Sequence, residues 1–103
     1  MPIDRVQALK ALLEQDPNNS FVRYGLAQAY SSNGQFAEAV AAYRDLIAAN
    51  PDYVAAYYHG GQALERLGQP EEARAIYEQG IDACTRTGDG HTRSEIQAAL
   101  DIL

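Results

Sequence analysis

The sequence predicts an all-α fold in which antiparallel helix hairpins stack as a right-handed superhelical solenoid. Three observations predict it. Residues 18–51 align with residues 52–85 at an offset of 34, and eleven of the aligned positions are identical. Apolar residues recur at intervals of three and four, as on one face of a helix. No proline interrupts segments 20–32 or 54–66, whereas Pro17 and Pro51 each stop a preceding helix.

The elements follow in chain order. Residues 3–16 form a half-repeat, a single helix whose apolar residues share one face. Residues 18–51 and 52–85 form two full repeats of two helices each, which gives about two and a half units. Residues 92–103 form a capping helix that begins with the capping box Thr92 and Glu95. The whole chain of 103 residues has the size of one domain.

Turn and cap residues mark the ends of these helices. Gly34 and Gly68 can take the left-handed conformation that ends a helix. Pro70 suits the first turn of the next helix, where its missing N–H would have no partner. Asn19 and Asp52 can cap the first helix of each full repeat.

Composition excludes several classes of protein. Fourteen acidic and eight basic residues give a net charge of −6, which repels phosphate backbones, so we expect no nucleic-acid partner. The single cysteine cannot form an internal disulfide, and the histidines and cysteine lack zinc-ligand spacing, so we expect no metal or cofactor. The N-terminus lacks a signal-peptide pattern. Since the longest apolar run is six residues, against the roughly 20 that span a bilayer, we expect a cytoplasmic protein without a membrane partner.

The 34-residue unit resembles the tetratricopeptide repeat of small bacterial-type proteins, whose pattern is W-x₂-L-G-x₂-Y…A-x₃-F…P. The matching residues are Leu26, Tyr30, Ala39, Tyr43 and Pro51 in the first unit, and Tyr57, Gly61, Ala73 and Tyr77 in the second. The departures are Arg23 in the first unit and Gly60, Leu64 and Thr85 in the second. The aromatic positions of the pattern imply that Tyr30, Tyr43 and Tyr77 are core residues.

The resemblance implies a non-enzymatic protein–protein interaction module, a scaffold or adaptor that holds a peptide or helix of a partner in a concave groove. In this family the first helix of each repeat lines that groove. The implied groove residues are Phe21, Tyr24, Gln28, Ser31, Ser32, Tyr58, Gln62, Glu65 and Arg66. We expect Tyr24 and Tyr58 to be exposed, and Gln28 and Gln62 to offer amide hydrogen bonds to an extended chain.

The charge of the partner also follows from the resemblance. One subfamily grips the carboxyl terminus of its ligand with lysine, asparagine and arginine on the first helices. The matching positions here hold Tyr24, Gly25, Gln28, Tyr58, His59 and Gln62, which supply no cationic clamp. We therefore expect a neutral or basic peptide segment rather than an acidic one.

Two alternatives stay open. The incomplete terminal repeats could associate between copies, so that the chain is a structural self-assembly unit, a weak homodimer held in part by Leu100 and Leu103. Against this, Arg5, Lys10, Glu14 and Arg93 could make the outer faces polar enough for a monomer. Separately, protonation of His59 near pH 6 could tune ligand affinity. No constellation of residues indicates catalysis.

Overall fold

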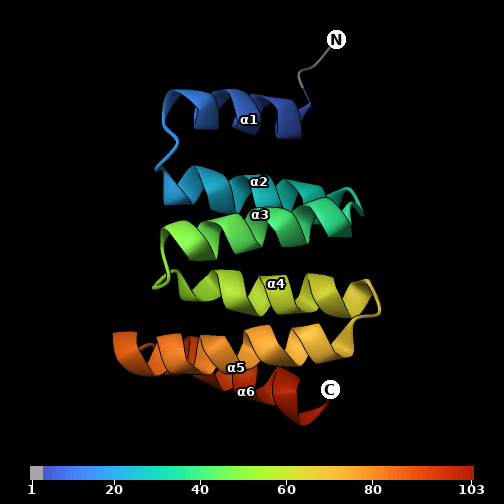
Figure 1. Ribbon diagram of the computed structural model, residues 1–103, viewed down its shortest axis with the longest axis vertical. Helices are drawn as coiled ribbons and strands as arrows, with labels where there is room; N and C mark the ends of the chain where they lie inside the picture. Colours follow the sequence, from blue (N-terminus) through green and yellow to red (C-terminus); the bar gives the residue numbers. More distant parts are fainter. Residues whose placement is uncertain (1–3) are drawn as a thin grey trace.

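The fold, given by a computed structural model that describes residues 4–103, is a stack of antiparallel helices about 44 Å long (Figure 1). Over those residues every regular element is helical, so the prediction of an all-α helical-repeat solenoid is confirmed. The helices are α1 (Arg5–Gln15), α2 (Ser20–Ser32), α3 (Phe36–Ala49), α4 (Val54–Arg66), α5 (Pro70–Thr87) and α6 (Gly90–Asp101). The predicted half-repeat helix begins at Ile3, which lies outside the described residues.

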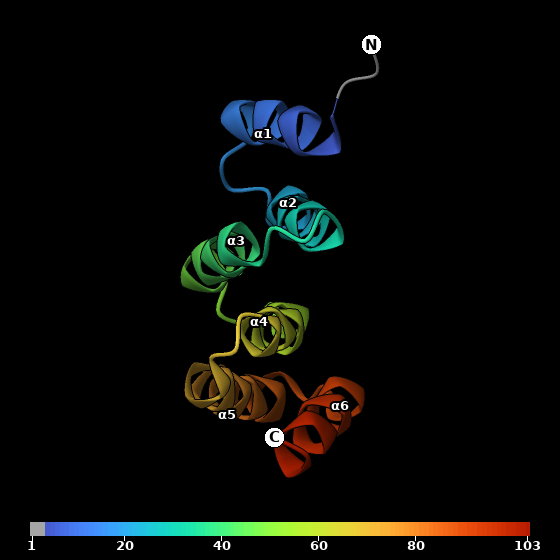
Figure 2. The same cartoon turned by 90° about the vertical axis from the view of Figure 1, so that its right-hand side faces the viewer.

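The helices fall into two rows. Seen from the side, α2, α4 and α6 form one row, and α3 and α5 form the other (Figure 2). Each helix packs most closely against its neighbours in the chain. The largest fully buried side chains are Tyr43, Tyr77, Leu46, Leu64 and Ile96, which lie between the rows. One row therefore presents an uninterrupted face made of the first helix of each unit.

Of the tyrosines predicted to be core residues, Tyr43 and Tyr77 are fully buried, as expected. Tyr30 is only half-buried. It lies where the small cluster under α1 meets the main core, and the ammonium of Lys10 stands 5.8 Å from its ring centroid. The single helix α1 covers this ring less completely than a full repeat would.

Four of the predicted helix ends are confirmed. Gly34 and Gly68 have φ angles of 76° and 73°, a conformation that a residue without Cβ adopts freely. Pro70 is the first residue of α5. The side-chain oxygen of Asn19 accepts a hydrogen bond of 3.1 Å from the backbone N–H of Val22 and caps α2.

Two predicted caps are wrong. Asp52 does not cap α4, because its carboxylate instead pairs with the guanidinium of Arg86 at 2.7 Å. The capping helix begins at Gly90 rather than residue 92 and ends at Asp101. Its cap is Asp89, whose carboxylate accepts hydrogen bonds from both the backbone N–H and the hydroxyl of Thr92. Thr92 therefore lies inside α6 and cannot open a capping box with Glu95.

The remaining side chains with possible chemistry are few. Cys84 is buried, and burial raises the pKa of its thiol, as expected for a structural residue. Among residues 4–103, no group of three or more histidine, cysteine or carboxylate side chains is placed to hold a metal ion. No described helix has the length and apolar character needed to cross a bilayer.

Candidate functional site

The face formed by α2, α4 and α6 contains three hollows. The N-terminal hollow lies between α1 and α2, the central hollow between α2 and α4, and the C-terminal hollow between α4 and α6. Gln28, Ser31 and Ser32 line both the first and the second. Gln62 and Arg66 line both the second and the third. The hollows thus form one continuous surface, which we call the α2–α4–α6 face.

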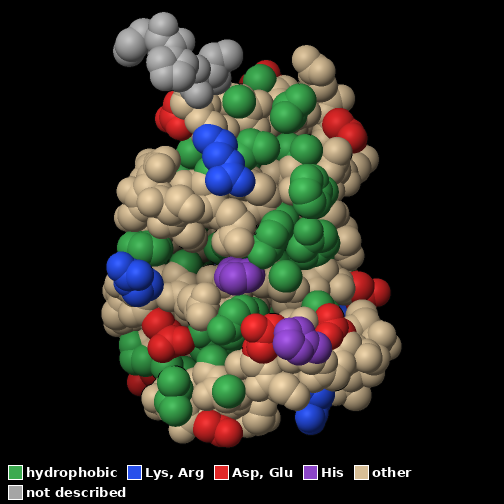
Figure 3. Space-filling view, turned by 180° about the vertical axis from the view of Figure 1, so that it is seen from behind, with side chains coloured by type: hydrophobic (Ala, Val, Ile, Leu, Met, Phe, Trp, Pro, Cys, Tyr) green, Lys and Arg blue, Asp and Glu red, His purple; other side chains and the backbone are tan. Residues whose placement is uncertain are grey.

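All nine residues expected to form the groove line at least one of these hollows. Phe21, Tyr24, Gln28, Ser31 and Ser32 line the N-terminal hollow, and Tyr58, Gln62, Glu65 and Arg66 line the C-terminal hollow. The space-filling view of this side shows hydrophobic side chains exposed from α1 downward, with charged groups scattered among them (Figure 3). The helical repeat places them together because Tyr24 and Tyr58, and Gln28 and Gln62, occupy equivalent positions in successive units.

The N-terminal hollow is the most apolar part of this face. Phe21 is 78% exposed and Leu12, from α1, is 51% exposed. Leu12 corresponds to Leu46 in the first full repeat, which is completely buried. The difference has a structural cause: α2 and α4 lie on either side of α3, whereas α1 packs chiefly against α2.

Tyr24 was expected to be exposed, but it is half-buried. Its ring centroid lies 5.3 Å from that of Tyr53 and 5.8 Å from that of His59, so the second unit covers part of it. Its hydroxyl accepts a 3.0 Å hydrogen bond from the side-chain amide of Gln28. Burial, with a smaller electrostatic effect from Tyr53, raises the pKa of Tyr24. Tyr58 is also half-buried, and its ring meets that of His59 edge-on.

The side-chain amides of Gln28 and Gln62, both expected to be free for a ligand, differ in their hydrogen bonding and exposure. The oxygen of Gln28 accepts a hydrogen bond from the hydroxyl of Tyr43, and its nitrogen donates to Tyr24. Gln28 is therefore already engaged within the protein, whereas Gln62 is exposed. In the second unit the hydroxyl of Tyr77 donates to the carboxylate of Glu65 instead. Gln62 is therefore more accessible to a ligand than Gln28.

His59 is a residue of this face that the sequence did not place among the groove residues. It lines the central hollow, and its ring stacks on Tyr43 with centroids 6.4 Å apart. Burial lowers its pKa below 6.5, while a hydrogen bond with Gln62 and the negative charge of Glu95 act in the opposite direction. The sequence could have indicated His59 as a groove residue, because it follows Tyr58 in the segment that matches the groove-lining first helix of the repeat.

Phe36, Leu12 and Ile102 are further residues of the face that the sequence did not indicate. Phe36 lines the central hollow, and the guanidinium of Arg66 lies 4.7 Å from its ring centroid, at cation–π distance. Ile102 lines the C-terminal hollow and is 87% exposed. Leu12 and Phe36 lie on helices that were not expected to line the groove, and Ile102 lies at the very end of the predicted capping helix. Their positions in the repeat therefore did not identify them as groove residues.

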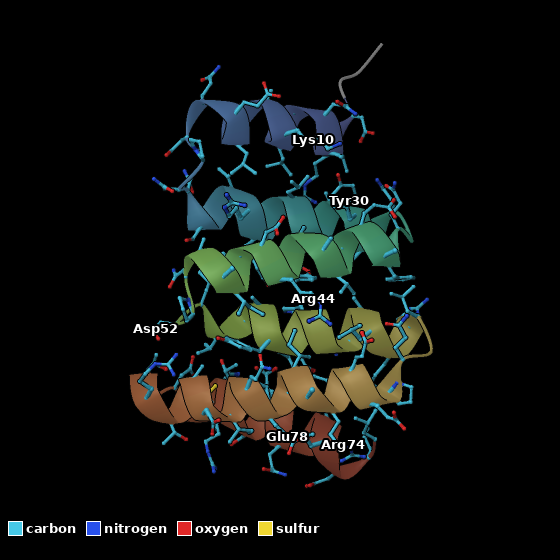
Figure 4. The ribbon with its side chains drawn as sticks, in the orientation of Figure 1. Lys10, Tyr30, Arg44, Asp52, Arg74 and Glu78 are labelled. Atoms are coloured by element: carbon cyan, nitrogen blue, oxygen red, sulfur yellow. The ribbon has the colours of Figure 1, made fainter. Side chains whose placement is uncertain are left out.

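The opposite side of the molecule is different in character. Figure 4 shows Arg44 extending from α3, and Arg74 and Glu78 extending from α5. The guanidinium of Arg44 is 3.3 Å from the carboxylate of Glu72, with both side chains more than half exposed. Such pairs contribute little stability. This side is a charged, solvated surface and supplies control positions for tests of the α2–α4–α6 face.

Stacked helix hairpins with a hollowed face made by their first helices define a helical-repeat protein. The family model for the tetratricopeptide repeat matches residues 24–86. A solved tetratricopeptide repeat domain protein from Salinibacter ruber is 38% identical, with a TM-score of 0.77 over 82% of this chain and 86% of its own. The chain belongs to the tetratricopeptide repeat family.

Two other relatives extend the comparison. A TPR repeat-containing protein of Pseudomonas aeruginosa is 25% identical over 92% of this chain and 90% of its own length. The TPR2B domain of yeast Sti1, solved in a complex with pHsp70, has a TM-score of 0.86 over 92% of this chain and 76% of its own. At 20% identity the likeness to Sti1 shows a shared fold.

Proposed function

We propose that this chain is a non-enzymatic protein–protein interaction module that binds a peptide or helix of a partner protein along the α2–α4–α6 face. The observation that carries the proposal is the continuity of the three hollows, which together bring all nine expected groove residues onto one face. The Sti1 domain, whose fold is shared, was solved in a complex with pHsp70, which supports a binding role for such a fold.

Phe21 is the anchor that this proposal singles out. A side chain that is 78% exposed and stands beside Leu12 leaves apolar surface in water, and covering it would favour association. Aromatic side chains with few rotatable bonds are common energetic centres of interfaces. The half-buried Tyr24 and Tyr58 would add rigid walls rather than free anchors.

A neutral or basic segment suits this face better than an acidic one. The chain carries a net charge of −6, and the positions of a cationic clamp hold tyrosine, glycine, histidine and glutamine. An acidic ligand would therefore meet long-range repulsion without a clamp of several cationic side chains to offset it.

A random twelve-residue peptide library displayed on phage tests the proposal. We expect selection on the immobilised protein to enrich binding peptides. Their affinity for Phe21→Ser should be lower than for the wild type by about tenfold or more, as for the loss of an aromatic anchor. Arg74→Ser, on the opposite side, is the matched control and should bind them like the wild type. Enrichment of no peptide, or of peptides that lose affinity only in the control variant, would refute the proposed function.

Self-assembly through the terminal repeats remains a second candidate, because Leu12 and Ile102 expose large apolar side chains near the two ends of the stack. Leu100 and Leu103 are poor test positions, since both pack against the protein's own core. Light scattering coupled to size exclusion, over a range of concentrations, tests this candidate. A mass that doubles in the wild type but not in the double variant Leu12→Ser/Ile102→Ser would support it, and a constant monomer mass would exclude it.

A further inference from the structure

The C-terminal hollow has a chemical character of its own. It lies between α4 and α6 and has a volume of about 610 Å³. Its walls carry two carboxylates, Glu65 from α4 and Glu95 from α6, together with apolar surface from Tyr58, Ala99 and Ile102. The N-terminal hollow, in contrast, has no carboxylate among its lining residues.

Glu65 is held in place by a residue beneath it. The hydroxyl of the buried Tyr77 donates a hydrogen bond to its carboxylate. Fixing a side chain before a ligand arrives reduces the conformational entropy that binding would otherwise cost. The position equivalent to Glu65 in the first unit is Ser31, so this arrangement belongs to the second unit alone.

The two carboxylates have no arginine or lysine partner within the described residues 4–103. Arg66 also lines the hollow, but its guanidinium is drawn toward the ring of Phe36, 4.7 Å away, and forms no ion pair with either carboxylate. The ring of His91 lies 3.5 Å from the carboxylate of Glu95 and is 87% exposed. The hollow therefore keeps net negative charge that a ligand cation could neutralise.

Apolar surface lies beside that charge. Ile102 is 87% exposed and Tyr58 is half-buried. A lysine or arginine side chain has the complementary composition, because its stem is apolar and its end is cationic. A purely apolar side chain would leave both carboxylates unpaired, and an acidic one would be repelled by them.

We propose that the C-terminal hollow binds a lysine or arginine side chain of the partner segment, with its charged end between Glu65 and Glu95 and its stem along Tyr58 and Ile102. Tyr77 acts as a positioning residue that holds the Glu65 carboxylate. The inference rests on the proposed function, because the basic residue belongs to the segment bound along the α2–α4–α6 face.

The peptides selected from the phage library test this directly. We expect them to share one basic residue, and we expect Glu65→Gln and Glu95→Gln each to weaken binding about two- to fivefold, in the range of partly exposed ion pairs. Because glutamine can still accept the hydrogen bond from Tyr77, Glu65→Gln changes the charge and keeps the geometry. The same peptides with norleucine in place of the basic residue should bind wild type and both variants equally.

Tyr77→Phe and Tyr43→Phe form a matched pair for the positioning role. Each removes one buried hydroxyl hydrogen bond to a residue of the same face. We expect only Tyr77→Phe to reduce the preference for the basic peptide over its norleucine form, by about twofold, since it alone releases a carboxylate. An equal loss in both variants would assign the effect to stability and overturn the positioning role.

The outcomes separate this inference from the proposed function. Peptides that require Phe21 but bind Glu65→Gln and Glu95→Gln as tightly as the wild type would overturn the basic-residue site and leave the proposed function intact. Selection of no peptide that depends on the α2–α4–α6 face would overturn both.

Discussion

Gly61 and Tyr77 are in closer contact than any side chain at position 61 would permit. A Cβ placed on Gly61 would lie 2.1 Å from the Cε1 atom of the Tyr77 ring. Tyr77 is fully buried, so its ring has no free space into which it could move. The approach of α4 to α5 therefore depends on the absence of a side chain at this position. In the first unit the equivalent position is Ala27, so the close contact is specific to the second unit.

We predict that Gly61→Ala destabilises the protein. Overpacking a dense core costs about 1–3 kcal/mol, whereas alanine gains about 1 kcal/mol over glycine in a helix interior. With the ring unable to move we expect a net loss of about 1 kcal/mol, which lowers Tm by roughly 4–8 °C for a domain of this size. Urea and thermal denaturation followed by circular dichroism would measure it.

Gly25→Ala is the matched control on α2. A Cβ there would lie 3.5 Å from Leu9, an ordinary van der Waals contact. We expect this variant to be as stable as the wild type or more stable, through the gain in helix propensity. If Gly61→Ala behaved in the same way, the inferred packing of α4 on α5 would be wrong.

We predict that Tyr24 and Phe21 differ in their effect on stability. Tyr24→Ala removes a half-buried ring that contacts Tyr53 and His59 and a hydroxyl that accepts from Gln28, so it should cost about 1–3 kcal/mol. Phe21→Ala removes an exposed ring and should change stability by less than about 0.5 kcal/mol. Chemical denaturation of both variants checks this, and equal losses would contradict the burial described for Tyr24.

We predict that the imidazole of His59 titrates below pH 6.5. Burial disfavours the charged form and lowers its pKa, although the hydrogen bond with Gln62 and the charge of Glu95 oppose this. NMR titration of the imidazole Cε1 proton, assigned with His59→Gln, would give the midpoint. The tyrosines that pack against the ring from α2, α3 and α4 are Tyr24, Tyr43 and Tyr58.

The lowered pKa of His59 also makes the stability of the protein depend on pH. Because the folded-state pKa is depressed, the contribution of neutral His59 is present above pH 6.5 and is lost as the pH falls through the folded-state value. Wild type should therefore lose more stability than His59→Gln between pH 7 and the folded-state midpoint. A midpoint at or above 6.5 would contradict the burial of this ring.

We predict that Tyr43 resists ionisation at high pH. Burial raises its pKa to about 12. A hydrogen bond with Ser31 opposes this rise, and a small electrostatic effect of Tyr24 adds to it. Since the folded-state pKa is raised, the stability that the neutral phenol contributes is complete below pH 10 and is lost between pH 10 and about 12. Absorbance titration at alkaline pH should show one late-ionising tyrosine fewer in Tyr43→Phe than in the wild type. An unchanged titration curve would contradict the prediction.

Much of the candidate site was predictable because a repeat copies its geometry. Once an offset of 34 residues is recognised, Tyr24 and Tyr58 must lie on one face of the stack, whatever their surroundings. The nine expected residues accordingly line a continuous set of hollows. Which of their polar groups are free to bind a ligand was not predictable. The hydrogen bond from Tyr43 to Gln28, for example, joins two different helices.

The sequence alone determined the helical class, the repeat length and the limits of α2 and α4, because each of these depends on short-range features. Helix periodicity, the positive φ of Gly34 and Gly68 and the Asn19 cap all act within a few residues. Tertiary structure decided what depends on distant partners. It turned Asp52 from a potential cap into the ion-pair partner of Arg86, 34 residues away. It also formed the hydrogen bond from the Tyr77 hydroxyl to the Glu65 carboxylate. Glu95 of α6 and Glu65 of α4 line one hollow because folding brings charges from separate units together.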